Sequence, residues 1–242
     1  MPPILHIPNS STCFPNKEGF VIDIPTLDAE VNKLTDWYTE DLFNLDGVIK
    51  VIAPFSRIFC DVERFVDDSI EEMAAKGAGV CYTRLDTGEE MRRVTTELKE
   101  FILHDYYYPH HQRLEQAVDE QLQQHGKAFI IDGHSFPDIP FVRDTDQHPG
   151  RPDINIGTDP FHTPEKLIEK TAKHFKTHGF SVEMNRPYSG TMVPLKYYRE
   201  NANVHSIMIE VNRRLYLDEN GNRKQNKPEE LNQIISGLIK TV

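Results

Sequence analysis

Short apolar runs alternate with longer amphipathic segments along the 242 residues of the chain. The apolar runs are rich in Ile, Val and Phe and end at Pro, Gly, Asn or Asp, which is typical of buried strands. They predict strands at 3–7, 48–52, 57–62, 128–132, 153–157, 181–185 and 206–212. The amphipathic segments predict helices at 26–44, 106–125, 163–178 and 228–240. This alternation indicates an α/β domain with a largely parallel or mixed central sheet.

Three segments have a distinct pattern. Residues 26–44 are predicted as one continuous helix, because apolar residues recur there at helical spacing. Residues 66–100 are mixed and charged, and we interpret them as an excursion or a lid over a site. Residues 136–152 are rich in proline and aspartate, so they are predicted as a loop.

Length and composition narrow the class of protein. A chain of 242 residues fits one domain, over 1–242. The net charge of −11, with scattered basic residues, argues against a nucleic-acid partner. No apolar run approaches the roughly 18 residues of a membrane span, and the N-terminus lacks the pattern of a secretory signal. We therefore expect a cytoplasmic protein without a membrane partner. Cys13, Cys60 and Cys81 have no metal-binding or disulfide spacing and are interpreted as free thiols.

Uncommon polar residues follow the ends of several predicted strands. The clusters are His6–Asn9, Asp61–Arg64, Asp132–Ser135 and Asn185–Tyr188, and Glu210 lies late in the last predicted strand. In open α/β sheets the ligand crevice lies beyond the carboxyl ends of the strands. We therefore expect these clusters to converge on one site.

Two of these residues suggest metal chemistry. His134 leaves a buried strand, where an imidazole can ligate zinc while Asp132 accepts from its other nitrogen; the alternative is a capping loop in which His134 only packs. Glu210 interrupts an apolar strand, and burial near a metal would raise its pKa toward that of a general base. The alternative is that Glu210 faces solvent on an edge strand, or pairs with Arg213 and Arg214.

Other charged residues are candidates for binding. Arg57 and Arg64 bracket the strand predicted at 57–62, and a guanidinium suits a substrate carboxylate; a surface ion pair with Glu63 or Asp67 is the alternative for Arg64. Asp36 is expected within the first helix, where its carboxylate could complete a zinc site.

Other familiar motifs are missing. The sequence contains no HExxH, no GxSxG and no phosphate-binding glycine loop. This argues against zincins, α/β-hydrolases and nucleotide-binding proteins. His110 and His111 are interpreted as packing or surface residues.

Taken together, the motifs resemble the N-formylglutamate amidohydrolase family over residues 4 to 219. The matching segments are Ile7-Pro8-Asn9-Ser10-Ser11, Thr35-Asp36-Trp37, Ser56-Arg57 through Asp61-Val62-Glu63-Arg64, Asp132-Gly133-His134-Ser135, Asn155-Ile156-Gly157-Thr158, Asn185 to Gly190, and His205 through Glu210 to Glu219. The resemblance implies a three-layer α/β/α sandwich, similar to zinc carboxypeptidases.

The resemblance also implies an activity. Zinc, with His134, Asp36, Asn9 and His6 as candidate ligands, would act with Glu210 on water to hydrolyse N-formyl-L-glutamate to formate and glutamate, in cytoplasmic histidine degradation. Arg64 and Arg57 would hold the substrate carboxylates, and Asn185 and Tyr188 would line the pocket.

This chain departs from the family pattern at two positions. Asn9 stands where the family has a histidine after Pro, which leaves three alternatives: weaker metal binding, a different metal, or substitution by His6. Glu63 replaces the Asn of Asp-x-Asn-Arg, where it would neutralise Arg64 and disfavour an acidic substrate. The competing hypotheses are thus another acyl amino acid or small peptide as substrate, and a non-catalytic binding protein that holds no metal.

Overall fold

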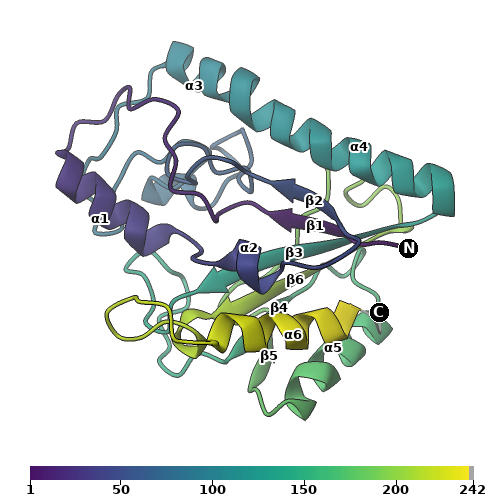
Figure 1. The fold of residues 1–242 in the computed structure, drawn as a ribbon. Coiled ribbons are helices and arrows are strands. Elements are labelled where there is room, and N and C mark those ends of the chain that lie inside the picture. Colours follow the sequence, from purple (N-terminus) through teal and green to yellow (C-terminus); the bar gives the residue numbers. More distant parts are fainter. Residues whose placement is uncertain (240–242) are drawn as a thin grey trace.

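The computed structural model describes residues 1–239, which form a mixed β-sheet with helices on both faces (Figure 1). The strands are β1 (Ile4–Ile7), β2 (Ile49–Ile52), β3 (Ala128–Phe136), β4 (Ile154–Gly157), β5 (Val182–Met184) and β6 (Val204–Asn212). The α-helices are α1 (Ile24–Leu34), α2 (Thr39–Leu42), α3 (Thr96–Ile102), α4 (Tyr108–His125), α5 (Glu165–Thr177) and α6 (Lys227–Ile239). The predicted α/β class is confirmed, and residue 240 of the last predicted helix lies outside the described residues.

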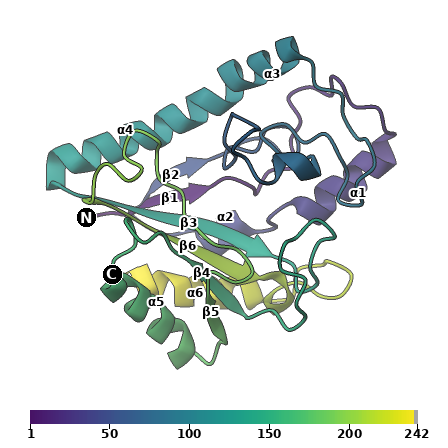
Figure 2. The same ribbon diagram turned by 180° about the vertical axis from the view of Figure 1, so that it is seen from behind.

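The strand order is β2-β1-β3-β6-β4-β5. Strands β2, β1, β3 and β6 pair in parallel, whereas β4 is antiparallel to β6 and parallel to β5. The carboxyl ends of β1, β3 and β6 therefore meet at one edge, and those of β4 and β5 point to the opposite edge. The α4 helix covers one face of the sheet, and α5 and α6 cover the other (Figures 1 and 2), which gives three α/β/α layers.

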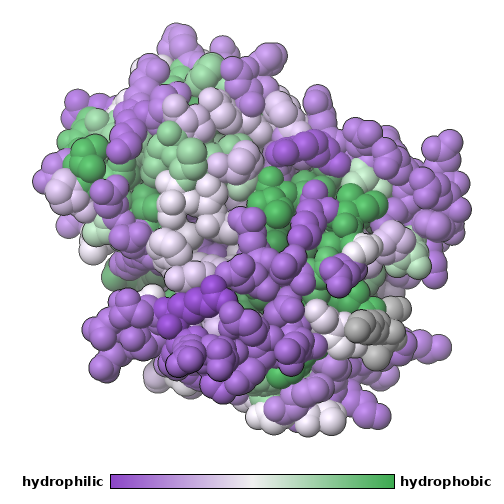
Figure 3. Space-filling model, in the orientation of Figure 1, coloured by the Kyte–Doolittle hydropathy of each residue, from purple (hydrophilic) through white to green (hydrophobic). Residues whose placement is uncertain are grey.

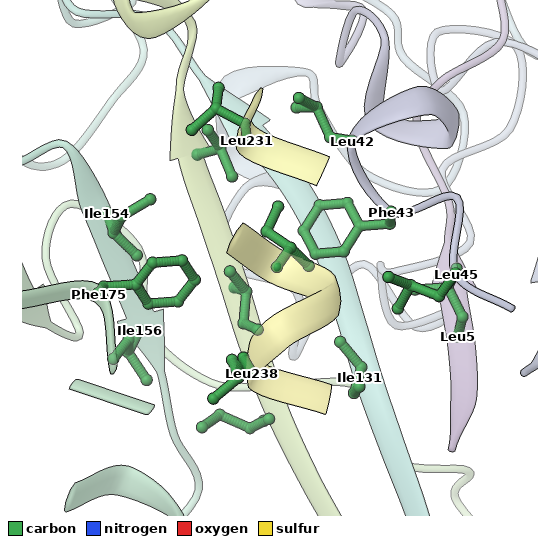
Figure 4. Packing of buried hydrophobic residues seen from close by; sticks show 14 of the residues in the cluster. Leu5, Leu42, Phe43, Leu45, Ile131, Ile154, Ile156, Phe175, Leu231 and Leu238 are labelled. Atoms are coloured by element: carbon green, nitrogen blue, oxygen red, sulfur yellow. The ribbon is translucent and has the colours of Figure 1, made fainter. Parts of the chain in front are cut away.

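The two faces of the sheet are packed differently. On one face, residues such as Leu5, Ile131 and Ile209 pack with α5, α6 and Phe43 into the largest apolar cluster (Figure 4). On the other face, Ile4 and Ile130 pack against α4 near the strand starts, and polar residues follow towards the strand ends. Because successive side chains of a strand point to opposite faces, each strand serves both.

The predicted single helix at 26–44 is wrong, because the chain breaks after Leu34. The Asp23 carboxylate caps α1 by accepting from the Thr26 amide, and the helix ends at Thr35. Tyr38 then adopts a left-handed conformation with φ +60°, which a continuous helix does not allow. Asp36 thus lies between two helices, where its amide donates to the Asn9 carbonyl.

The predicted strand at 57–62 is also wrong. The Ser56 carbonyl accepts from the amides of Phe59 and Cys60, which closes a turn. The apolar residues of this segment belong to two clusters of buried side chains outside the sheet. A short buried apolar run has the same composition in a turn as in a strand, so the pattern alone could not separate them.

Residues 66–100 form an irregular layer with a 3-10 turn at Ala74–Lys76 and the start of α3. The Asp86 carboxylate connects this layer to two other segments. It accepts hydrogen bonds from Lys33 of α1 and, at 3.2 Å, from Arg143 of the 136–152 loop. Arg143 also donates to Glu30 at 2.9 Å. Side chains therefore join α1, this layer and the predicted loop.

The surface near the C-terminal helix is polar. Figure 3 shows mainly hydrophilic side chains over α6 and the loop before it. No helix within residues 1–239 is long and apolar enough to cross a bilayer.

Candidate active site

The candidate site lies at the carboxyl ends of β1, β3 and β6, on the face covered by α4. Pairing sets His6 beside Asp132 and sets His134 beside Glu210. All four side chains are at most 5% exposed. The predicted convergence is therefore confirmed for the clusters on these three strands.

His134 lies at the centre of a carboxylate cluster. Its Nδ1 is 3.1 Å from the Asp36 carboxylate, and its Nε2 is 3.0 Å from Glu63 and 3.1 Å from Asp132. Burial alone would lower the pKa of His134, but the charges of Glu63 and Asp132 raise it well above its usual value. The packing-only alternative for His134 does not fit these contacts, since both ring nitrogens face carboxylates.

Two further histidines extend the cluster under α4. His6 Nδ1 is 2.7 Å from Asp132, and His6 Nε2 is 2.9 Å from Nε2 of His110. His110 is fully buried in the first turns of α4, and burial together with His6 lowers its pKa to about 2. The sequence interpretation missed this contact, because a histidine after a tyrosine-rich segment carries no signal of a partner on a distant strand.

Glu63 forms no direct ion pair with Arg64 among the described residues, although its charge contributes to raising the pKa of Arg64. Its carboxylate accepts from the Asn9 amide at 2.8 Å and faces His134. Arg64 instead lies 3.5 Å from Asp61 and 3.9 Å from Glu71. Glu63 is a site residue that the sequence interpretation missed.

Arg57 and Arg64 converge on one buried carboxylate. Asp61 lies 3.0 Å from Arg57, and it also accepts from the Tyr82 hydroxyl at 2.9 Å. Both guanidiniums remain partly exposed, at 16% and 24% of their side chains. Asp61 thus holds Arg57 by hydrogen bonds and Arg64 by a longer ion pair, and within the described chain both guanidiniums retain free donors.

Asp36 connects His134 to a third arginine. Arg213 donates to Asp36 at 2.9 Å and to the Ser135 hydroxyl at 3.2 Å. Arg214 pairs with Asp138 and Asp153 on the outside. Neither arginine forms an ion pair with Glu210 among the described residues, but the charge of Arg213 still acts on Glu210 and lowers its pKa.

Glu210 is a buried acid with one free oxygen. Strand β6 lies between β3 and β4, so the edge-strand alternative is wrong. Within the described chain, Oε2 of Glu210 has no hydrogen-bond partner. Burial, with the nearby charges of Asp36 and Glu63, raises the pKa of Glu210 to about 8, although His134 and Arg213 oppose the shift.

Asn185 and Tyr188 lie at different distances from this centre. Strand β5 runs opposite to β6, so its end points away from the site; the Asn185 side chain there bonds to Thr158 at 2.8 Å. The chain then returns, and the Tyr188 carbonyl accepts from Asn155, the cross-strand neighbour of Glu210. Burial first, then the charges of Asp144 and Glu210, raises the pKa of Tyr188. The structure thus brings Tyr188 towards Glu210 but not Asn185.

The donor set of this site fits a divalent metal ion. Ligand atoms of His6, Glu63 and Asp132 lie within 4.8 Å of one another, and His134 Nε2 contacts two of these residues. The buried Asn9 Oδ1 has no partner among the described residues. Asp36 accepts on the far nitrogen of His134, which is the usual support for a metal-ligating histidine.

Known proteins are similar to this chain in sequence and in fold. The model of the N-formylglutamate amidohydrolase family matches residues 1–217. An N-formylglutamate deformylase from Pseudomonas putida is 24% identical over 196 residues, which cover 76% of this chain and 71% of that protein.

Two solved structures are similar in fold. A crystal structure of N-formylglutamate amidohydrolase from Ralstonia eutropha superposes with a TM-score of 0.83 at 22% identity, over 100% of this chain and 94% of that one. A protein from Agrobacterium tumefaciens has a TM-score of 0.66 at 15% identity, over 99% and 88%. With the family model matching most of its length, the chain belongs to the N-formylglutamate amidohydrolase family.

Proposed function

We propose that this protein hydrolyses the amide bond of an N-acyl amino acid, and that its substrate is N-formyl-L-glutamate, which gives formate and L-glutamate. The family and the name of the Pseudomonas putida relative support the reaction. The structural observation that carries the proposal is the buried Glu210 carboxylate beside His134, with a free oxygen and a raised pKa. The expected setting is cytoplasmic histidine degradation.

Glu210 acts as the general base in this proposal. Its free Oε2 takes a proton from a water molecule that attacks the formyl carbonyl, and the acid then returns the proton to the leaving amine. Burial makes the Glu210 carboxylate a stronger base than an exposed one, and its ionised form is the one that takes the proton from water. Burial between β3 and β4 keeps bulk water from the carboxyl group.

The ion that the family resemblance implies is zinc. When bound, a divalent metal supplies Lewis-acid polarisation of the amide carbonyl and lowers the pKa of water. His6, Asp132 and Glu63 would hold it together with His134, whose Nε2 contacts both carboxylates, and Asn9 lies beside Glu63. Asp36 would orient the His134 ring from Nδ1.

The substrate carboxylates are assigned to Arg57 and Arg64. Asp61 fixes both guanidiniums while each keeps donors for a ligand. Tyr188 would form the wall next to Glu210. Asn185 would support that wall indirectly, since its bonds to Thr158 hold the end of β5 from which the chain returns.

The test combines metal analysis with formate release from N-formyl-L-glutamate. His134→Ala should lose both the metal and turnover. Glu210→Gln should keep the metal and lose about 10²- to 10⁴-fold in kcat. Glu229→Gln, an exposed acid on α6, is the matched control and should behave as wild type. A wild-type protein that holds no metal and releases no formate with added zinc or manganese would instead support a non-catalytic binding protein.

A further inference from the structure

A buried stack of side chains continues the site face of the sheet beyond His134. Phe136 follows His134 by two residues on β3, so both side chains point to the same face. Phe136 is 1% exposed, and its ring lies edge-on to the Tyr188 ring, with the centroids 6.3 Å apart. The Arg151 guanidinium lies 5.5 Å from the Tyr188 ring centroid, within the range of a cation–π contact. Phe136 and Arg151 therefore both pack against Tyr188.

Asn155 fixes the backbone on either side of Pro187. Its amide nitrogen donates to the Tyr188 carbonyl at 2.8 Å, and its oxygen accepts from the Arg186 amide at 3.0 Å. Asn155 is fully buried and is the cross-strand neighbour of Glu210 in the pair of β4 and β6. The sheet therefore sets the position of Tyr188 relative to the proposed base.

The Tyr188 hydroxyl is bound to the loop at 136–152. It donates to Oδ2 of Asp144 at 3.0 Å. Arg151 donates to the same oxygen at 2.6 Å and to the Pro137 carbonyl at 3.1 Å. The side chains of Arg151 and Asp144 are 0% and 6% exposed. A phenol has a single proton to donate, and here it goes to Asp144, so the part of Tyr188 that can face a ligand is its ring.

We propose that Asp144 and Arg151 are positioning residues, which hold the Tyr188 ring as the wall of the acyl pocket and thereby restrict the substrate to a small acyl group such as formyl. The acyl pocket is the space beside Glu210 that takes the substituent of the reacting carbonyl. The inference rests on the proposed function, because Glu210 activates the water that attacks this carbonyl. The substituent then lies close to Glu210, on the side to which Asn155 brings Tyr188.

The restriction follows from how the ring is held. A ring that is bonded at its hydroxyl and packed against a buried guanidinium can move aside only if both contacts are lost. Interiors packed in this way respond to a change of a single methyl group. The wall therefore admits the hydrogen of a formyl group and disfavours the methyl group of an acetyl group.

The experiment compares N-formyl-L-glutamate with N-acetyl-L-glutamate, which carries a methyl group in place of the formyl hydrogen. The kcat/KM for both compounds is measured in wild type, Asp144→Ala, Arg151→Lys, Tyr188→Phe and the double variant of Asp144→Ala with Tyr188→Phe. Asp144→Asn replaces Asp144→Ala if the latter does not fold, and circular dichroism checks all variants. Calorimetry measures the dissociation constants of both compounds in a Glu210→Gln background, which needs no turnover.

Wild type should prefer the formyl compound by about 10- to 200-fold, the range for one carbon atom in a closely fitting pocket. Asp144→Ala and Arg151→Lys should lower this preference at least about fivefold, and the preference in binding should fall with it. Tyr188→Phe removes the same hydrogen bond as Asp144→Ala. The double variant should therefore go no further than the larger single one, because residues that act through one contact are not additive.

Asp138→Asn is the matched control. Asp138 lies in the same loop and also pairs with an arginine, Arg214, but its side chain is 45% exposed. This variant should keep the wild-type preference. A loss of preference in Asp138→Asn equal to that in Asp144→Ala would mean that any damage to the loop has this effect, which would overturn the assignment.

Three further results would overturn the wall: no preference for formyl in wild type, an unchanged preference in Asp144→Ala and Arg151→Lys, or additive effects of Asp144→Ala and Tyr188→Phe. Failure of the proposed function gives a different result. A protein that releases no formate, but whose preference in binding falls in Asp144→Ala, would refute the hydrolysis and leave the wall standing. Formate release with a preference indifferent to these residues would do the reverse.

Discussion

His134 and Glu210 are cross-strand neighbours, because β3 and β6 pair in parallel with these two residues in register. Both ring nitrogens of His134 face carboxylates, and one carboxylate oxygen of Glu210 has no partner in the described chain. The sheet therefore sets the spacing between the proposed metal ligand and the proposed base. Side chains on regular strands hold such a spacing more rigidly than side chains on loops do.

Asp36→Asn tests whether Asp36 orients His134. The amide keeps the shape but loses the charge that faces Nδ1 and Arg213. We expect metal affinity to fall by about 10- to 100-fold, as for other outer-shell partners. Chelator competition measures it, and Asp41→Asn, an exposed acid on α2, serves as control. Wild-type affinity in Asp36→Asn would show that His134 is oriented by other contacts.

Arg57→Ala and Arg64→Ala test recognition of the substrate carboxylates. Losing a charge-assisted hydrogen bond costs about 1.5–3 kcal/mol, so KM for N-formyl-L-glutamate should rise about 10- to 100-fold with a smaller change in kcat. N-formyl-L-glutamine, which lacks the side-chain charge, should respond less to at least one variant. Equal increases in KM for both substrates in both variants would contradict recognition of the side-chain carboxylate.

Asp86→Asn tests the tie between α1 and the layer at 66–100. Burial opposes ionisation of Asp86, but bonds from Lys33 and from the amides of Val142 and Arg143 lower its pKa below the usual value. A lowered folded-state pKa stabilises the fold above the unfolded pKa, near 3.9, and this contribution is lost as the pH falls through the folded value.

At neutral pH the variant should therefore lose about 2 kcal/mol of unfolding free energy in urea titrations, and the difference should shrink in acid. Asp28→Asn, on the exposed side of α1, is the control. A difference that is constant from neutral to acidic pH would exclude an effect of the charge.

Thiol reactivity tests the burial of the cysteines. The three thiols are free, as expected, and only Cys13 is exposed. Burial raises the pKa of Cys60 well above its usual value and that of Cys81 to about 11, and the thiolate is the reactive form. An aromatic disulfide reagent should titrate one thiol in the native protein and all three after unfolding. Cys13→Ser should abolish the native reaction; rapid labelling in that variant would show that the layer around Cys60 opens.

The sequence predicted the elements whose pattern has a single interpretation. Six of the apolar runs are strands, and α4, α5 and α6 follow their amphipathic pattern. The prediction of a strand at 57–62 was wrong because a buried turn can have the same composition as a strand. The prediction of one helix at 26–44 failed because the left-handed backbone at Tyr38 does not change the spacing of the apolar residues.

The convergence of His134 and Glu210 was predictable, because His134 follows one apolar run and Glu210 interrupts another. The direction of the strands was not predictable, because nothing in the local sequence shows that β4 and β5 run antiparallel to β6. Asn185 was therefore expected at the wrong end of the sheet. Partners distant in the chain were also hidden. Glu63 joins the cluster through contacts with Asn9 and His134, and His110 joins it through a contact with His6.

Near the carboxyl ends of the central strands, the alternation of side chains separates the apolar core from the candidate site by the parity of the residue number. In β1, β3 and β6, odd positions such as Ile7, Ile131 and Ile209 build the core with α5 and α6, while even positions such as His6, His134 and Glu210 build the site. Substitutions at even positions near the strand ends can change the ligand set with the core intact. A metal ligand, or the reaction itself, can therefore change without substitutions in the apolar interior of the sheet.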